Sequence, residues 1–135
     1  MKLADTGKLC YQKNMISYIY IMATILLTCY GQLVLKWRIP MHGTLPESSW
    51  PKLLHLFSLF FDPFILSGFV AAFMAALCYM AALSKLPLSH AYPFMGITFG
   101  IVLLGSALFF NEPLNWYKVA GVLLIVAGIA LGSQG

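Results

Sequence analysis

Four long apolar segments dominate this sequence, at about residues 17–35, 63–83, 90–110 and 115–131. Each is close to the roughly 20 residues that a helix needs to cross the hydrocarbon core of a bilayer. Lipid offers no water to the backbone amides, so a segment of this kind spans as a helix that satisfies its own hydrogen bonds. We therefore expect an all-α membrane protein with four transmembrane helices.

The composition excludes an ordinary soluble domain. Hydrophobic residues make up 61% of the 135 residues and charged residues only 9%, against roughly 25% charged in soluble domains. Four spans leave no room for a separate soluble domain, so we expect a polar N-terminal tail at residues 1–14 and a single four-helix transmembrane domain at residues 15–135. The first span lacks a small-residue cleavage pattern, so we expect it to stay in the membrane.

The longest connection, residues 39–62, contains several prolines and a segment, residues 50–61, whose apolar side chains lie mostly along one helical side. This pattern predicts an amphipathic interfacial helix. Asp62 and Pro63 are suited to cap and open the second span. The other connections are short, so we expect consecutive spans to be antiparallel neighbours. Basic residues divide equally between the two sides, and the positive-inside rule therefore leaves the orientation open.

Polar residues follow one stripe of the first span. Thr24, Thr28 and Gln32 are spaced by four, with Tyr30 beside them. Lipid cannot satisfy such groups, so the stripe should face the protein interior or a cavity. The threonines have an alternative, because their hydroxyls can bond to carbonyls of their own helix.

Small residues mark possible helix contacts. Gly96 and Gly100 form a GxxxG pair, and Gly121 and Gly128 lie seven residues apart on one side of the last span. Small residues let helix backbones approach closely in lipid. The second pair suggests a seam between protomers, and packing within the chain is the alternative.

Charged residues lie at the ends of the spans, in the N-terminal tail or in the connections. Proton-coupled pumps usually carry an ionisable group at mid-depth, and no Asp, Glu, Lys or Arg lies there. The sequence has no catalytic triad, phosphate-binding loop or metal-ligand cluster, so we expect no enzymatic activity, metal or cofactor. The basic residues are distributed as membrane anchors, which argues against nucleic-acid binding. The same cations could hold a headgroup phosphate.

Three motifs together carry a family resemblance. They are Gly-Gln-Leu at 31–33 followed by Lys36, the stretch at 86–93 ending in Ala-Tyr-Pro, and Asn-Glu-Pro-Leu at 111–114 leading into Gly121. In order and spacing the chain resembles the four-helix drug/metabolite transporter superfamily, EamA-like and small multidrug resistance-like proteins included. Within it the pattern is most similar to the subunits that flip aminoarabinose-phosphoundecaprenol.

The small multidrug resistance family is a second resemblance, with one departure. Its first helix carries a membrane-embedded glutamate that binds protons and cationic drugs in turn, and this sequence has Thr28 at the aligned position. The resemblance therefore implies the architecture, including pairing through the fourth helix, and not proton-coupled drug exchange.

The resemblance implies a flippase that moves a polyprenyl-phosphate-linked sugar across the bacterial inner membrane, as a homodimer or a heterodimer with a four-helix paralogue. A small-metabolite or cationic-compound exporter and a non-transporting scaffold subunit are the alternatives. Glu112 would shape the turn before the last span or contact an aminosugar. We expect the substrate path along Thr24, Thr28, Tyr30, Gln32 and Tyr92, and phosphate binding by Lys36, Arg38, Lys85 and His90.

Overall fold

The computed structural model describes the backbone of residues 2–132 and 134, and the side chains of residues 15–132 and 134. The described chain is helical and contains no strand. The order of elements is α1 (Lys2–Arg38), the short 3-10 helix η1 (Ile39–His42), α2 (Ser49–Leu59), α3 (Pro63–Leu83), α4 (Leu88–Phe110) and α5 (Trp116–Gly132).

The four apolar segments of the sequence lie in α1, α3, α4 and α5. Helix α1 begins at Lys2, so it also includes residues that we predicted as a polar tail before a span starting at residue 17. The division of the chain into a tail and a transmembrane domain stays a prediction.

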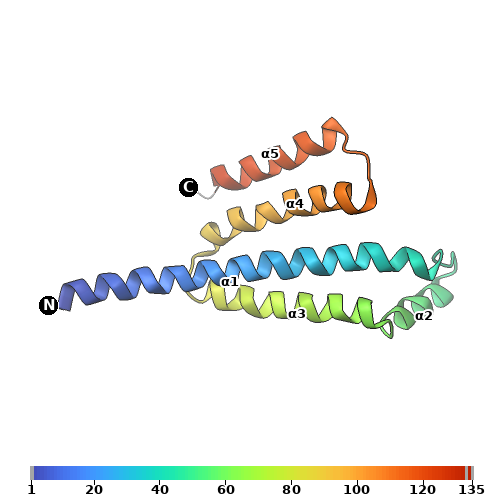
Figure 1. The fold of residues 1–135 in the computed structure, drawn as a ribbon, viewed down its shortest axis with the longest axis horizontal. Helices are drawn as coiled ribbons and strands as arrows, with labels where there is room; N and C mark the ends of the chain where they lie inside the picture. Colours follow the sequence, from blue (N-terminus) through green and yellow to red (C-terminus); the bar gives the residue numbers. More distant parts are fainter. Residues whose placement is uncertain (1, 133, 135) are drawn as a thin grey trace.

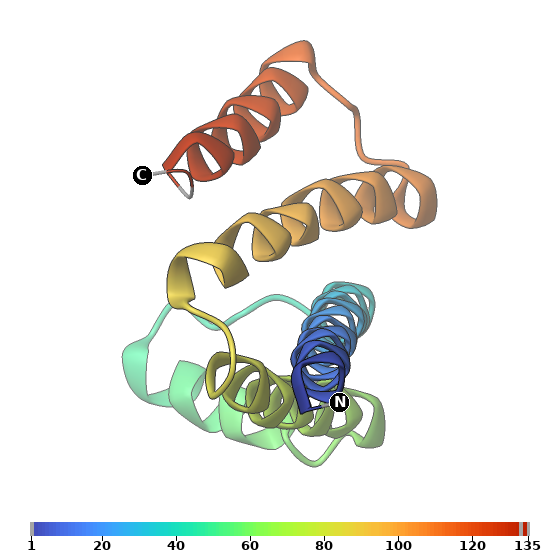
Figure 2. The same cartoon turned by 90° about the vertical axis from the view of Figure 1, so that its left-hand side faces the viewer.

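Helix α1 is the centre of the arrangement (Figure 1). Helix α3 packs along one side of it and α4 along the other, while α5 packs mainly on the far side of α4. The end-on view shows the same sequence of layers (Figure 2). Our expectation that consecutive spans would be neighbours is wrong for α3 and α4, because α1 lies between them and they contact each other little. The short α3–α4 connection still makes these helices antiparallel, and the start of α1 and the end of α5 lie toward the same end of the bundle (Figure 1).

Among the described residues, three helices are long and apolar enough to cross a membrane: the Met15–His42 part of the chain, α3 and α4. Helix α5 is equally apolar in character and has 17 residues. At about 1.5 Å per residue, the 21 residues of α3 extend over about 31 Å, the thickness of a hydrocarbon core. The chain is a multi-pass membrane protein.

The helix ends follow from their local sequence. Asp62 caps α3, as predicted: its Oδ1 atom accepts hydrogen bonds from the backbone N–H groups of Phe64 at 2.9 Å and Ile65 at 3.3 Å. Helix α4 ends at Phe110, and the next residue, Asn111, has the left-handed conformation that asparagine tolerates better than most residues (φ 49°).

Helices α1 and α3 approach most closely where two glycines face each other. A methyl group added at Gly31 would lie 3.0 Å from the carbonyl oxygen of Gly68. Small residues continue this contact surface on α3, where Ala71 and Ala75 are buried. Close backbone approach is the form of packing that stabilises helix pairs in lipid.

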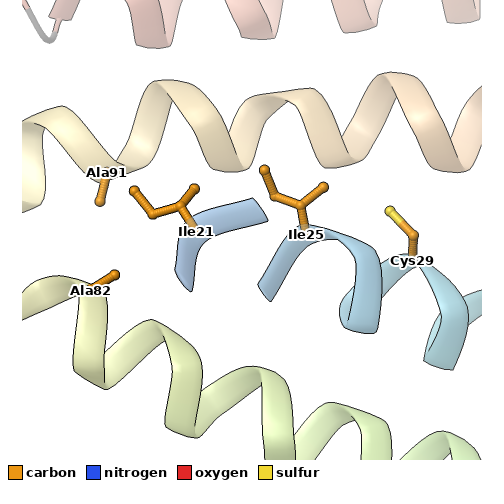
Figure 3. Packing of buried hydrophobic residues seen from close by; sticks show 5 residues of the cluster. All are labelled: Ile21, Ile25, Cys29, Ala82 and Ala91. Carbon is orange, nitrogen blue, oxygen red and sulfur yellow. The ribbon is translucent and has the colours of Figure 1, made fainter. Parts of the chain in front are cut away.

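The buried core of the chain lies between α1 and its two neighbours. Ile21, Ile25 and Cys29 lie along the face of α1 that is turned toward α4, and Ala82 of α3 and Ala91 of α4 complete the cluster (Figure 3). This face of α1 lies next to the predicted polar stripe, so packing here fixes the direction in which the stripe points.

Candidate functional site

A cavity of about 570 Å³ lies between α1, α4 and α5. Two members of the predicted stripe, Thr28 and Gln32, line it from α1. None of its described lining residues is charged, so the cavity combines an apolar wall with a few hydroxyl and amide groups. The residues contributed by the other two helices are Tyr92, Met95, Gly96, Thr98, Phe99 and Val102 of α4 and Ile125 and Ile129 of α5.

A second cavity, of about 470 Å³, adjoins the first toward the α4–α5 loop. The two share Gln32, Phe99 and Val102 as lining residues. The second cavity is charged: Lys36, Glu112 and Lys118 line it, together with the hydroxyl-bearing Ser106. The two cavities together therefore extend from a charged end, past Gln32, into an uncharged and mostly apolar middle.

An ion pair connects α1 to the α4–α5 loop at the charged end. The Nζ atom of Lys36 lies 2.7 Å from Oε1 of Glu112, and the side chains of the two residues are 55% and 34% exposed. The hydrogen bond and the charge of Lys36 hold the pKa of the Glu112 carboxyl below its usual value. Exposed pairs of this kind contribute little to stability.

Arg38 belongs to a different cluster, at the junction of α1, η1 and α3. Its Nε atom donates to Oδ2 of Asp62 at 2.8 Å, and Nε2 of His42 lies 2.7 Å from the same oxygen. Burial alone would raise the pKa of Asp62, but the hydrogen bonds from Arg38, His42 and the α3 backbone outweigh it and lower the pKa to about 2. Asp62 is therefore ionised at neutral pH.

Lys85 and His90 lie at the opposite end of the bundle, around the short α3–α4 connection. Both residues are exposed. Of the four cations predicted to bind phosphate, the structure thus has Lys36 and Arg38 at one end and Lys85 and His90 at the other.

The structure separates the remaining members of the predicted stripe from the cavity. The Thr24 hydroxyl is buried against α3, where it donates to the carbonyl oxygens of Tyr20 at 2.8 Å and Ala75 at 3.3 Å. The Tyr30 hydroxyl lies 3.2 Å from Oγ of Ser67, also on α3. Thr28 and Gln32 are together in the cavity, and Tyr92 lines it from α4.

The four glycines singled out in the sequence have different surroundings. A methyl group at Gly96 would lie 3.6 Å from Ile129 and 3.8 Å from Val126, so this glycine faces α5. At Gly100, Gly121 and Gly128 an added methyl group would meet nothing within 4 Å among the described atoms. The last two glycines therefore make no close contact within the described part of the chain.

Three polar residues that line the two cavities, Thr98, Ser106 and Lys118, were missed by sequence reasoning. Thr98 is a single threonine in a long apolar segment, and such a residue usually bonds to its own helix. Lys118 stands near the start of the last span, where it looks like an interface anchor. Its separation of six residues from Glu112, across a proline turn, was the available signal.

Comparison with known proteins finds a transporter family and several similar membrane-transport subunits. Residues 12–133 match the EamA-like transporter family. A probable 4-amino-4-deoxy-L-arabinose-phosphoundecaprenol flippase subunit ArnE of Aeromonas salmonicida is 36% identical over 78% of this chain and 87% of its own length. A probable flippase subunit ArnF for the same lipid, from Erwinia tasmaniensis, is 34% identical over 84% of this chain and 91% of its own. An uncharacterized protein of Sinorhizobium fredii, y4nH, is 32% identical over 90% and 98%. No solved structure matches the chain.

Proposed function

Since this chain belongs to the EamA-like transporter family, we propose that it is a subunit of a flippase that moves a polyprenyl-phosphate-linked sugar across the bacterial inner membrane. The observation that carries the proposal is the pair of adjoining cavities, with Lys36 and Lys118 at the charged end and Thr28 and Gln32 in the uncharged middle. The names of the ArnE and ArnF relatives support the class of substrate.

The headgroup of such a lipid needs polar partners throughout its crossing. A phosphate or sugar that left water for an apolar wall would lose hydrogen bonds at a large cost in free energy. Hydroxyl and amide groups on Thr28, Gln32 and Tyr92 replace part of that hydration without holding the anion too tightly. The polyprenyl chain is apolar and stays in the surrounding lipid.

Cations at the two ends receive the phosphate. At one end Lys36 exchanges Glu112 for the phosphate, with Lys118 beside it. At the other end Lys85 and His90 are exposed and can bind the phosphate after it crosses. Arg38 has five N–H donors. Its Nε atom is held by Asp62, so only its remaining N–H groups could reach a headgroup, and its main role is to position the end of α1.

The active unit in this proposal is a dimer, either with a second copy or with a four-helix paralogue. Helix α5 has no buried residue among those described, and Gly121 and Gly128 have open space around them. A partner helix seated on these glycines would cover α5 and close the cavity from the outside.

Two further features complete the membrane arrangement in this proposal. Helix α5 is the fourth span, since 17 apolar residues are within the range, roughly 17–25, that crosses a bilayer. Helix α2 lies along the interface, because Leu53, Leu54 and Phe57 are exposed on a short helix between two spans.

Reconstituted vesicles test the function. The chain, alone and together with a four-helix paralogue, is inserted into liposomes that contain a polyprenyl-phosphate glycoside, and a membrane-impermeant reagent measures how much of that lipid reaches the outer leaflet. We expect the protein to accelerate flipping of the glycoside and to leave ethidium uptake unchanged. Ethidium transport without glycoside flipping would indicate the exporter alternative, and neither activity in correctly inserted protein would indicate a scaffold subunit.

A further inference from the structure

Thr98 on α4 has an unusual environment for a helical threonine. The residue is 8% exposed, and its hydroxyl has no hydrogen-bond partner among the described residues. Serine and threonine in a helix normally satisfy themselves on a carbonyl of the preceding turn. Thr24 and Ser106 do so in this chain, at 2.8 Å and 2.9 Å. A buried hydroxyl without this bond is available to something else.

The surroundings of Thr98 indicate what that partner is. Thr98 lines the uncharged cavity from α4, and α1 contributes the hydroxyl of Thr28 and the amide of Gln32 to the same lining. These three groups offer donors and acceptors but no charge. A phosphate can pass these groups but finds no cation among them to hold it, whereas a neutral hydroxyl-bearing group could satisfy all three.

The level of Thr98 along the bundle separates it from the cations. Gly105 of α4 packs against Leu33 of α1, and Ala91 of α4 belongs to the cluster around Ile21. Thr98 is seven residues from both Gly105 and Ala91, so it lies midway, close to the level of Thr28. Along α1 this level is about 12 Å of helix rise from the backbone of Lys36, and neither Lys36 nor another charged residue is among the described residues that line the cavity at this level.

We propose that Thr98, with Thr28 and Gln32, forms a mid-depth site that binds the hydroxyl groups of the sugar ring while the lipid crosses. This inference rests on the proposed function and specifies it: the site recognises the sugar, and the phosphate is recognised at the ends. The cavity volume of about 570 Å³ is ample for one sugar ring, and Tyr92 and Phe99 provide ring faces for its apolar side. Thr98 is then a specificity residue.

The test compares two lipids in the vesicle assay, a polyprenyl-phosphate glycoside and the same polyprenyl phosphate without sugar. Thr98→Val removes the hydroxyl with almost no change of volume, and Thr98→Ser retains it. Ser84→Ala is the matched control, because the Ser84 hydroxyl bonds to the carbonyl of Ala81 at 2.8 Å outside the cavity. We expect Thr98→Val to slow glycoside flipping by roughly three- to tenfold and to leave the sugar-free lipid unchanged. Thr98→Ser and Ser84→Ala should behave as the wild type.

Two results would overturn the inference. Equal slowing of both lipids by Thr98→Val would make Thr98 a packing or general path residue, and wild-type glycoside flipping in that variant would remove it from the path. A wild-type protein that is inserted but moves no glycoside would instead overturn the proposed function, and this inference with it. The behaviour of the wild type thus distinguishes the two failures.

Discussion

The Nε atom of Arg38 lies 2.8 Å from Oδ2 of Asp62 and joins the last turn of α1 to the first turn of α3. The other oxygen of the same carboxylate caps α3, and His42 adds a third element, η1. The Arg38 side chain also lies over the Phe64 ring, with 5.0 Å to the ring centroid. The Asp62 carboxylate therefore holds the end of α1, the helix η1 and the start of α3 together.

Replacing Asp62 with Asn should destabilise this junction and leave the cavity in place. The side-chain amide oxygen of the introduced asparagine can still accept the backbone hydrogen bonds of the cap, but the ion pair with Arg38 is lost. We expect a lower thermal unfolding temperature in detergent, and flipping that persists below that temperature. Glu47→Gln in the same loop is the control, since Glu47 is exposed. An unchanged unfolding temperature in Asp62→Asn would mean that the ion pair contributes nothing to stability.

The same carboxylate predicts how stability depends on pH. The pKa of Asp62 in the folded protein is about 2, below its ordinary value of 3.8. The contribution of its ion pairs is therefore fully present above about pH 4 and is lost as the pH falls toward 2. We expect a loss of folded wild-type protein between these values that is smaller in Asp62→Asn, measured by circular dichroism. A flipping rate whose pH dependence between about 6 and 8 disappeared in Asp62→Asn would contradict this, because it would identify Asp62 as a proton carrier.

The crossing of Gly31 and Gly68 should tolerate added volume poorly. A methyl group at Gly31 meets the backbone oxygen of Gly68 at 3.0 Å, while one at Gly68 meets the backbone oxygen of Gly31 at 3.4 Å. Backbone cannot move aside as a flexible side chain can, so we expect Gly31→Ala to destabilise the fold by about 1–3 kcal/mol and Gly68→Ala by less. Gly100→Ala, which meets nothing within 4 Å, should be neutral or slightly stabilising. Thermal unfolding of the three variants checks this order, and equal effects would argue against a close crossing.

The helices and several of their ends could be predicted because each depends on local sequence. Spans of about 20 apolar residues, the prolines of the first loop and the cap at Asp62 are all readable along the chain. The neighbours of each helix could not be read in the same way. A short loop fixes the antiparallel direction of α3 and α4, but it does not prevent α1 from lying between them, where it contacts both helices.

The predicted stripe shows a second limit, which comes from helix geometry. A helix turns by about 100° per residue, so residues spaced by four drift by roughly 40° at each step. Between Thr24 and Gln32 the drift is roughly 80°, enough for Thr24 to contact α3 while Gln32 lines the cavity. The spacing of these residues could not show which of them contact α3 and which line the cavity. The role of Thr98 could not be predicted from the sequence either, because only the structure shows that its hydroxyl makes no hydrogen bond to its own helix.

If two chains associate through α5, substitutions at Gly121 and Gly128 should weaken dimerisation without destabilising the single chain, unlike the substitution at Gly31. Gly121 and Gly128 have nothing within 4 Å among the described atoms of their own chain, so Gly121→Leu combined with Gly128→Leu should leave the fold of a single chain intact. Bulky side chains there would hold a partner helix away. We expect cross-linking of the dimer to fall severalfold while membrane insertion is unchanged. Full dimerisation of the double variant would exclude this face of α5 as the seam.

The central claim is that the lipid headgroup crosses along the uncharged cavity, and Gln32 tests it most directly because it lines both cavities. Gln32→Leu keeps a similar volume and removes the amide, and Gln134→Leu makes the same chemical change outside both cavities. The decisive measurement is the rate at which each variant flips a polyprenyl-phosphate glycoside in vesicles that contain equal amounts of inserted protein. The account predicts a loss of roughly tenfold or more for Gln32→Leu and a wild-type rate for Gln134→Leu. A wild-type rate for Gln32→Leu would contradict the account and place the path elsewhere.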